Sequence, residues 1–505
     1  MKKTLHRVAT AFLAMAMVVS SLNFGFVVKA ADVEQYTIYP TPQKVEYGTT
    51  QVTLSDEVNV VYEANIDQFT KQHVVDVFEL LGIQVKTGLD LDPAKTNVLV
   101  GINGQEGLAN TYFEENNLVN GFDFTKYDAS ILSIKDNTIA ILAKDTDAAF
   151  HAITSLKHIF TQVQNKEVTE LTIRDYADVK NRGFIEGYYG NPWSNEDRAD
   201  LMTFGGDYKL NNYIYAPKDD PKHNAQWRSL YSEEELAEIS KLAAAGNASK
   251  CYYVYALHTF MHNPVRFDSH YQEDLKVIQN KFEQLMDAGV KQFAILADDA
   301  GVPGNNPQNY VRLMTDMTNW MKEKAKTVDG LKTDLIFCPN DYMGMGNSSQ
   351  MQALKALPES VSIIQTGGRV WGEVGPNFND AFYANMGRPA YMWSNWPCSD
   401  NTKDSLIMGG AEKVLKPNVN PDTVNGIVLN PMQQSEPSKQ GLFTNADYAW
   451  NIWESEKKYD SVWHDSFNYI DHGTKYDTTG SNAYRELSKH MMSSAKLYND
   501  ESFEI

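Results

Sequence analysis

After Arg182, short apolar runs alternate with longer helix-like segments, and this rhythm constrains the fold more than any other feature of the chain. The expected strands are residues 183–187, 212–216, 252–257, 293–297, 334–338, 362–366, 390–393 and 426–429. Eight strands alternating with helices over roughly 260 residues indicate an α/β fold, a closed (β/α)8 TIM barrel. An open, doubly wound sheet is the alternative, but no Gly-x-Gly-x-x-Gly motif follows the first strand.

Two of the intervening helices carry clear signals in the sequence. One starts with Ser232 and, three residues later, Glu235, which form a capping box, and it is expected to end at Gly246. The other, at 307–326, has a row of methionines on one side. Such a row at helical spacing is typical of a core-facing surface rather than a ligand surface, so these methionines are predicted to be buried.

At 505 residues the chain is too long for one ordinary core. Its pattern predicts a small α+β domain at 32–178, the barrel at 179–448 and a helical C-terminal segment at 449–505. The first of these contains a predicted hairpin with an Asp136-Asn137 turn and a predicted helix at 147–160. It has no paired acids, histidine cluster or glycine loop that would suggest chemistry, so its expected role is structural support.

Residues 1–30 have the pattern of a secretory signal peptide. Three basic residues precede an apolar stretch at 8–28, and a small residue occupies the expected cleavage site. An uncleaved anchor is the alternative, but polar residues between Ser20 and Gly25 interrupt the stretch before it reaches a comfortable spanning length. We therefore expect a secreted, extracellular protein that begins near Ala31 and has no membrane span after cleavage.

Charge argues against some classes of partner, and cysteine content argues against disulfides and a metal site. A net charge of −20 disfavours nucleic acid or an anionic bilayer, because either would repel the chain. The three cysteines, Cys251, Cys338 and Cys398, are too few and too widely spaced for a disulfide framework, and no Cys/His spacing suits a metal. We predict three buried free thiols, no metal and no cofactor.

An adjacent pair of acids, Asp298 and Asp299, follows the apolar run at 293–297. Carboxylates at the carboxyl end of a parallel strand lie where an α/β protein exposes groups for chemistry. Two like charges on neighbouring residues do not ionise together easily, so one of the pair is expected to keep its proton and serve as a general acid. The structural alternative is a polar turn in which Asp299 caps the next helix.

Polar and aromatic residues also follow the other expected strands. They are Glu186 to Tyr189 with Trp193, Lys218 to Asp220, His258, Asn340 to Tyr342, Arg369 with Trp371, Trp393 to Asn395 with Asp400, and Asn430. Each has a structural explanation when taken alone, such as a satisfied histidine or a packed tryptophan. Together, carboxylates, amides and one lysine among aromatic rings suit a sugar, because hydroxyls take polar contacts while a pyranose face stacks on a ring.

Five separated motifs resemble glycoside hydrolase family 84, which includes β-N-acetylglucosaminidases, bacterial hyaluronidase-type toxins and O-linked N-acetylglucosamine hydrolases. They are Arg182-Gly-Phe-Ile-Glu-Gly-Tyr-Tyr-Gly-Asn-Pro-Trp193, Asn212-Tyr-Ile-Tyr-Ala-Pro-Lys-Asp-Asp-Pro221, Asp298-Asp299, Asn395 to Asp400 and Asn430-Pro-Met432. The resemblance extends from about Tyr36 to Trp450. Since members of the family typically continue into a helical domain, 449–505 is interpreted as its beginning, either truncated or in a short form.

The resemblance implies a retaining β-N-acetylglucosaminidase with substrate-assisted catalysis, in which the sugar's acetamide oxygen attacks the anomeric carbon to give an oxazoline. It implies that Asp298 holds the acetamide N–H, and that Asp299 protonates the leaving oxygen and later activates water. The residues implied in sugar binding are Gly187, Lys218, Tyr342, Trp393, Asn395, Asp400 and Asn430, with Tyr342 and Trp393 shaping the acetamide pocket. The implied partner is a glycan bearing β-linked N-acetylglucosamine.

The chain departs from the common family pattern around this site. Ala297 stands where an aromatic residue usually precedes the acids, and the segments 340–343 and 366–371 also differ. These differences concern the substrate more than the reaction. One alternative is an endo-acting hyaluronidase-type enzyme, for which Arg369 would offer a cation to a uronate. Another, of a different class, is a barrel that binds glycans without cleaving them.

Overall fold

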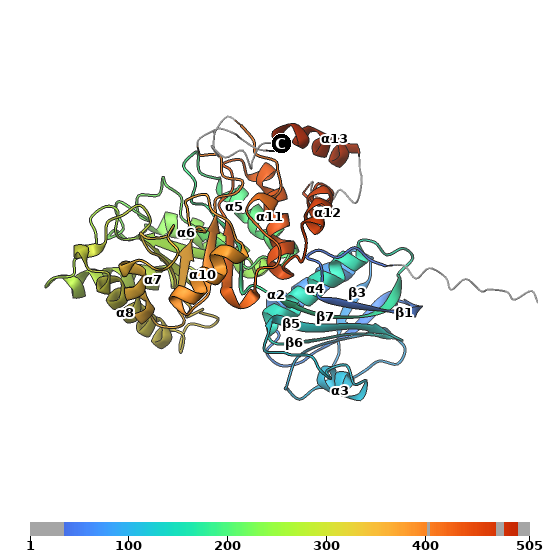
Figure 1. Ribbon diagram of the computed structural model, residues 1–505. Coiled ribbons are helices and arrows are strands. Elements are labelled where there is room, and N and C mark those ends of the chain that lie inside the picture. The colour runs from blue at the N-terminus through green and yellow to red at the C-terminus, as the bar shows by residue number, and fades with distance from the viewer. Residues whose placement is uncertain (1–34, 401–404, 471–478, 493–505) are drawn as a thin grey trace, which may run out of the picture.

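The computed structural model describes residues 35–400, 405–470 and 479–492. Within them, a domain built on a seven-stranded sheet lies beside a closed eight-stranded barrel, and the last helices pack near the barrel (Figure 1). The predicted signal peptide at 1–30 lies outside the described residues.

The N-terminal sheet has the strand order β1-β7-β5-β6-β4-β2-β3. Its strands are β1 (Lys44–Thr53), β2 (Glu57–Tyr62), β3 (Gln84–Thr87), β4 (Asn97–Ile102), β5 (Tyr127–Lys135), β6 (Thr138–Ala143) and β7 (Glu167–Ala177). Helices α2 (Gln68–Glu79) and α4 (Thr146–Phe160) cover the face toward the barrel, and α3 (Leu108–Glu115) covers the other (Figure 1). The predicted hairpin is present as β5 and β6, and the predicted helix as α4.

Both helices on the inner face of this sheet begin at an aspartate. Oδ1 of Asp67 accepts the N–H of Thr70 at 2.8 Å, and Oδ1 of Asp145 accepts the N–H of Ala148 at 2.9 Å. These caps satisfy N–H groups that the first turn of a helix leaves unpaired.

All eight strands predicted after Arg182 are present, and they close into a parallel barrel. They are β8 (Asn181–Ile185), β9 (Asn212–Tyr215), β10 (Tyr252–His258), β11 (Gln292–Leu296), β12 (Ile336–Cys338), β13 (Ser362–Gln365), β14 (Ala390–Ser394) and β15 (Val424–Leu429). The ring closes where β15 pairs with β8, with Leu429 opposite Phe184. The barrel prediction is confirmed, and the open-sheet alternative is wrong.

Successive residues of a barrel strand point alternately into the barrel and out toward the helices. In β9, Ile214 belongs to the apolar core inside the barrel, whereas Tyr213 belongs to the core between strands and helices. Val254 and Tyr253 of β10 divide in the same way. Because both sides of the strands are buried, their sequences are continuous apolar runs, which made them visible in the sequence.

The barrel helices are α5 (Asn195–Asp207), α6 (Glu233–Ser249), α7 (Tyr271–Asp287), α8 (Gln308–Lys324), α9 (Ser349–Ala353), α10 (Pro376–Met386) and α11 (Ser435–Trp450). The capping box at Ser232 is present, and the methionines of α8 are buried as predicted. The predicted end of α6 at Gly246 is wrong, because the helix continues to Ser249 and closes at Lys250 with φ of 61°. Gly246 instead permits close packing, since a Cβ there would lie 2.6 Å from the main-chain nitrogen of Tyr253.

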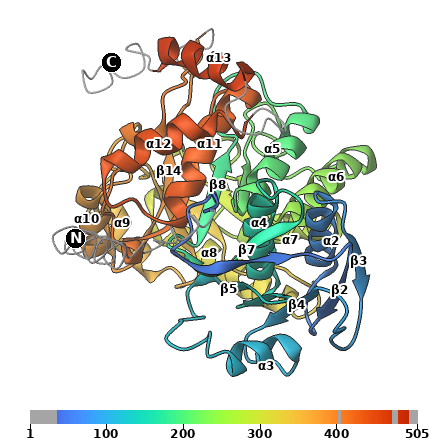
Figure 2. The ribbon, with the colours of Figure 1, turned by 90° about the vertical axis from the view of Figure 1, so that its right-hand side faces the viewer.

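The end of α11 joins the barrel to the N-terminal domain next to β7 (Figure 2). Nε1 of Trp450 donates to Oδ1 of Asp175 at 2.8 Å, and the carbonyl of Trp450 accepts the N–H of Asp178 at 2.9 Å. Lys209 Nζ lies 2.9 Å from Asp175 and 4.1 Å from the centre of the Trp450 ring. This buried cluster fixes the two domains to each other.

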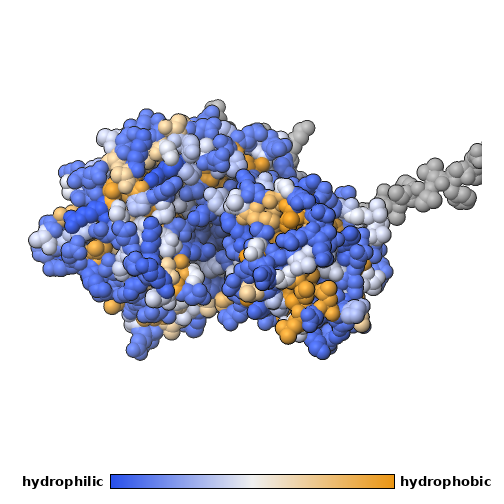
Figure 3. Space-filling model, turned by 90° about the horizontal axis from the view of Figure 1, so that it is seen from below, coloured by the Kyte–Doolittle hydropathy of each residue, from blue (hydrophilic) through white to orange (hydrophobic). Residues whose placement is uncertain are grey.

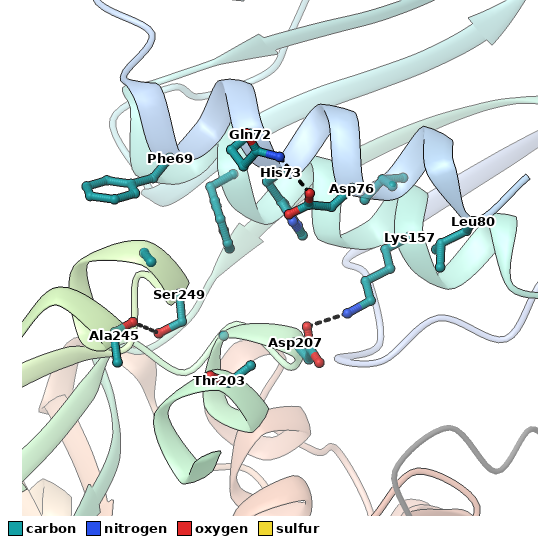
Figure 4. A pocket seen from close by; sticks show the side chains of 14 residues that line it. Phe69, Gln72, His73, Asp76, Leu80, Lys157, Thr203, Asp207, Ala245 and Ser249 are labelled. Carbon is teal, nitrogen blue, oxygen red and sulfur yellow. Dashed lines mark hydrogen bonds and ion pairs between the residues drawn. The ribbon is translucent and has the colours of Figure 1, made fainter. Parts of the chain in front are cut away.

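A second junction is a largely apolar recess between α2 and α4 on one side and α5 and α6 on the other (Figure 4). Lys157 of α4 points across it to Asp207, with 2.5 Å between Nζ and Oδ1. His73 stacks on Phe150 and bonds Thr154, and burial lowers its pKa to about 3. This histidine is therefore a neutral core residue.

After α11 the described chain is helical, with α12 (Glu456–Ser466) and α13 (Thr479–Ser488). The three cysteines are free and buried, as predicted. None of the helices in the described part of the chain combines the length and apolar character needed to cross a bilayer. Seen from below, the surface is mainly hydrophilic and is hollowed between the two domains (Figure 3).

Candidate active site

The nine residues predicted for the site line one pocket at the carboxyl end of the barrel strands. They are Gly187, Lys218, Asp298, Asp299, Tyr342, Trp393, Asn395, Asp400 and Asn430. Five further residues line it, namely Tyr189, Cys338, Thr366, Val370 and Trp371. The grouping is a fact of the structure, whereas the catalytic and binding roles of these residues remain predictions.

Asp298 follows the end of β11 and is buried between two basic side chains. Lys218 Nζ lies 3.7 Å from its Oδ2, and His258 Nε2 lies 3.5 Å from its Oδ1. Nδ1 of His258 accepts the N–H of Met261, so the ring proton is on Nε2, where it is donated to the main-chain carbonyl of Asp298 at 2.8 Å. Burial lowers the pKa of His258, so Lys218 is the cation that balances the Asp298 carboxylate.

Asp299 has a φ of 55°, in the left-handed region, and its side chain is exposed to the pocket. Oδ1 accepts the hydroxyl of Tyr342 at 2.8 Å, and Oδ2 accepts the hydroxyl of Tyr189 at 3.3 Å. Burial raises the pKa of both phenols, so at neutral pH they can donate to this carboxyl group. Asp298 and Asp299 lie in a turn, as the structural alternative expects, but Asp299 caps no helix, because the 3-10 helix Pro303–Asn305 and α8 both begin without a side-chain cap.

Asp400 links two sides of the pocket. Its Oδ1 accepts the main-chain N–H of Tyr189 at 2.8 Å and the thiol of Cys398 at 3.1 Å. The carboxylate is thereby held against the loop that follows β8. A charged acceptor in such a partly enclosed position can form strong hydrogen bonds with hydroxyl groups.

Two asparagines connect the ends of β8, β14 and β15. Oδ1 of Asn430 accepts the N–H of Gly187 at 3.1 Å, and its Nδ2 donates to Oδ1 of Asn395 at 3.0 Å. Nδ2 of Asn395 donates to the carbonyl of Val370 at 2.7 Å. This chain of amides fixes the orientation of the polar groups on this side of the pocket.

The Trp393 ring forms an aromatic wall that requires glycine at position 187. A Cβ on Gly187 would lie 2.5 Å from Cζ2 of Trp393, much closer than a real contact allows. The indole Nε1 donates to Oδ1 of Asn395 at 3.0 Å, so the ring has a fixed orientation. Such a wall can pack against an apolar face or a methyl group.

Tyr189 is the functional candidate that residue-by-residue prediction missed. It bonds both Asp299 and Asp400, and Lys218 Nζ lies 5.0 Å from the centre of its ring. A signal was available, because Tyr189 belongs to the aromatic motif after the first barrel strand. Cys338 had no comparable signal, since it lines the pocket only as the last residue of β12.

Other polar residues at strand ends are structural or lie outside this pocket. Glu186 is buried and accepts two hydrogen bonds from Arg198, each of 2.8 Å. Asp220 accepts the hydroxyl of Tyr231 at 2.6 Å. The Arg369 side chain is half exposed and lines a neighbouring recess instead.

The pocket thus combines a buried carboxylate beside a cation, an exposed carboxyl group held by two phenols, and a wall of amides and aromatic rings. The first suits charge stabilisation, the second suits proton transfer, and the wall suits a polyhydroxylated ring. Among the described residues, no group of three or more His, Cys, Asp or Glu side chains could hold a metal ion.

A (β/α)8 barrel with this site at its strand ends defines the class of protein as a barrel glycosidase. The family described as beta-N-acetylglucosaminidase matches residues 182–489, and the domain described as Glycosyl hydrolase family 20, domain 2, matches residues 35–176. The first match covers more than half of the chain, which therefore belongs to the β-N-acetylglucosaminidases of glycoside hydrolase family 84.

Relatives and solved structures agree with this assignment. Protein O-GlcNAcase of Mus musculus is 26% identical over 282 residues, which are 53% of this chain and 29% of that protein. The chain thus spans less than a third of this curated relative's length. The solved structure of CpGH84D is 42% identical with a TM-score of 0.85, covering 91% of this chain and 75% of that one. The solved structure of CpGH84B is 26% identical with a TM-score of 0.75, covering 91% of this chain and 77% of that one.

Proposed function

We propose that this chain is a secreted, retaining glycoside hydrolase that removes β-linked N-acetylglucosamine from glycans through an oxazoline intermediate. The observation that carries the proposal is the different setting of two adjacent acids in one pocket. Asp298 is buried beside Lys218, and its Oδ1 accepts no hydrogen bond within the described residues. Asp299 is exposed and held by the hydroxyls of Tyr342 and Tyr189. Family membership supports the choice of sugar.

In the first half of the reaction, the acetamide carbonyl oxygen attacks the anomeric carbon while the bond to the leaving oxygen breaks. Asp298 accepts the acetamide N–H and stabilises the positive charge that develops on that group. Lys218, 3.7 Å from this carboxylate, balances its charge. Asp299 donates its proton to the leaving oxygen.

In the second half, a water molecule attacks the anomeric carbon from the face that the leaving group vacated. Asp299, now a carboxylate positioned by Tyr342 and Tyr189, accepts a proton from this water. The bond between the acetamide oxygen and the anomeric carbon breaks, and the acetamide is restored. Two inversions at one carbon give overall retention of configuration.

The remaining pocket residues hold the sugar in this geometry. Asp400 and Asn430 offer an acceptor and an amide to its hydroxyl groups, and Lys218 offers a donor. Trp393 and Tyr342 bound the space for the acetamide methyl group. Orientation by these contacts contributes to the rate because the reacting atoms are held close together.

Chromogenic glycosides test the proposal directly. A β-N-acetylglucosaminide should be hydrolysed with retention, whereas the matching β-glucoside, which lacks the nucleophile, should be essentially inert. A thiazoline analogue of the oxazoline should inhibit competitively. Rapid hydrolysis of the β-glucoside would indicate a protein nucleophile, and no hydrolysis of either would indicate a glycan-binding barrel.

Endo action on an acidic polymer is a second candidate, favoured by two cations near the pocket. Arg369 and Lys416 line a recess next to the pocket, and both pair with Glu373 there, at 4.0 and 3.8 Å. Thr366 and Val370, on the same loop as Arg369, line the pocket itself. A uronate would take the place of the Glu373 carboxylate beside them. Sizing of the products decides between the candidates, because exo action releases a single sugar and endo action releases oligosaccharides.

Residues 1–30, which lie outside the described part of the chain, have the pattern expected for export. Three basic residues followed by the apolar stretch at 8–28 support it. N-terminal sequencing of the protein recovered from culture medium should give a start near Ala31. Retention of the full N-terminus in the membrane fraction would contradict it.

A further inference from the structure

A second polar cavity lies at the opposite end of the barrel, between the amino ends of its strands and the N-terminal domain. The barrel contributes Asn212, Gln292 and Asp334 to its wall, and the N-terminal domain contributes Tyr127, Asp128 and Asp145. The cavity has a volume of about 210 Å³. This is below the roughly 300–1,000 Å³ of sites for drug-sized ligands but several times the roughly 30 Å³ of one water, so the space admits only a small ligand.

Most of the charge in this cavity is already balanced. Three aspartates of its wall pair with cations, namely Asp128 with Arg182 at 2.6 Å, Asp334 with Lys180 at 2.9 Å and Asp147 with Lys250 at 2.9 Å. Lys144 of the wall donates to the main-chain carbonyls of Thr125 and Lys126, and its charge is opposite to that of Asp145, so a ligand of high charge would find little net field of opposite sign.

Asp145 is the carboxylate that does not follow this pattern. Its Oδ1 caps α4 through the N–H of Ala148, and it forms no ion pair with the described lysines and arginines. The residue is exposed, so its carboxylate can accept a further hydrogen bond from a neutral donor such as a hydroxyl group.

Gln292 provides an unpaired hydrogen-bond donor in the same cavity. Its Oε1 accepts Nδ2 of Asn212 at 2.9 Å, but its Nε2 is buried and has no acceptor within the described residues. The side chain is only 1% exposed. Buried donors are rarely left unpaired, so this amide points to an acceptor that enters the cavity.

We propose that the cavity binds a small, neutral, polyhydroxylated molecule, that is, a monosaccharide or a polyol. A hydroxyl group both donates and accepts, so such a molecule satisfies Asp145 and Gln292 together. A simple cation would leave the Gln292 amide unpaired, and a simple anion would lie among the aspartates of the wall. The partly exposed ring of Tyr127 adds an aromatic surface for the apolar face of a sugar. The proposal does not depend on the chemistry of the catalytic pocket.

Calorimetric titration of the full chain with D-glucose tests this site, with the catalytic pocket filled by the thiazoline analogue. The wild type should bind glucose saturably. Asp145→Asn keeps a capping oxygen, and Gln292→Glu keeps the side-chain shape, yet each should weaken binding about tenfold or more because a matched hydrogen bond is lost. Glu323→Gln, on an exposed residue of α8, should leave the affinity unchanged.

Tyr127→Ala should also weaken glucose binding, because it removes the aromatic surface; the position is partly exposed, so the substitution alters no buried contact. Thermal unfolding identifies any variant that fails to fold. A crystal soaked in D-glucose should show the sugar between Asp145 and Gln292. The absence of saturable binding, equal affinity in all variants, or glucose found only in the catalytic pocket would overturn the proposal.

Discussion

The hydroxyl of Tyr342 donates to Oδ1 of Asp299 over 2.8 Å, so a residue that follows β12 positions the acid that follows β11. In Tyr342→Phe, this acid would keep only the longer bond from Tyr189, at 3.3 Å. We expect kcat/KM to fall about 10- to 150-fold, since a hydrogen bond to a charged group contributes about 1.5–3 kcal/mol. Tyr383→Phe, at an exposed position on α10, should have no effect, and equal rates for the two variants would exclude a positioning role for Tyr342.

Asp400→Ala should lose several kcal/mol of transition-state binding, because this carboxylate is proposed to take sugar hydroxyls through charge-assisted bonds. The matched control is Glu283→Ala on α7, whose carboxylate pairs with lysines far from the pocket. Steady-state kinetics with a β-N-acetylglucosaminide measure both. Similar losses at the two positions would remove Asp400 from the binding site.

Gly187→Ala should impair binding through the Trp393 wall. The added Cβ would lie 2.5 Å from Cζ2 of Trp393, so the ring or the loop after β8 must move. We expect KM to rise by at least about tenfold, because displacements near 1 Å in a site are costly. Gly301→Ala is the control, since a Cβ there meets nothing within 4 Å. An unchanged KM in Gly187→Ala would show that the wall tolerates movement.

Acid should destabilise the fold through buried histidines. Burial lowers the pKa of His73 and His151 to about 3 and that of His158 to about 4. An unfolded chain protonates them near pH 6.5, so below that pH the unfolded state takes up protons that the native state excludes. The contribution of these neutral histidines to the free energy of unfolding is therefore fully present above about pH 6.5. It falls by up to about 1.4 kcal/mol per pH unit per histidine as the pH drops toward about 4.

Thermal unfolding measured between about pH 7 and pH 4 checks this sign. The Tm should decrease on acidification, and His73→Gln, which can still bond Thr154, should reduce the slope. A Tm that rises on acidification would mean that the histidines gain partners in the folded state instead.

The barrel was predictable because its strands are buried on both sides, so that each leaves a continuous apolar run in the sequence. Strand ends were less certain, as with β8, which begins at Asn181 rather than at the expected 183. In the N-terminal domain, β7 was missed because its buried positions include the polar residues Thr169 and Asp175, which interrupt the apolar alternation that marks a half-buried strand. The end of α6 was wrong because Gly246 serves packing rather than chain reversal.

The site was predictable as a set of residues because its motifs follow consecutive strands, and a barrel brings all strand ends to one face. The partners within the site were not predictable. Tyr189 bonds Asp299 and Asp400, which lie more than 100 residues away in the sequence, and only the closed ring places them together. The separate environments of Asp298 and Asp299 likewise depend on Lys218 and the tyrosines, which come from other strands.

Because the two acids have different environments and roles, their substitution should have different kinetic effects. Asp299 supplies a proton to the leaving oxygen, which matters greatly for an alcohol and little for a nitrophenolate that departs without help. Asp298 assists the acetamide, a need that every substrate shares. Asp299→Asn should therefore reduce cleavage of natural glycans far more than that of activated aryl glycosides, and it should also slow breakdown of the oxazoline.

Asp298→Asn should instead lower kcat/KM by a similar factor, on the order of 100-fold or more, for all leaving groups. A series of aryl N-acetylglucosaminides with graded leaving-group acidity separates the two cases, because the dependence on leaving group should be steep in Asp299→Asn and close to that of the wild type in Asp298→Asn. The alkaline limb of the pH profile should also flatten only in Asp299→Asn, since that residue acts in its protonated form. The opposite pattern would mean that Lys218 and His258 surround the proton donor, and that Tyr342 and Tyr189 position the residue that holds the acetamide.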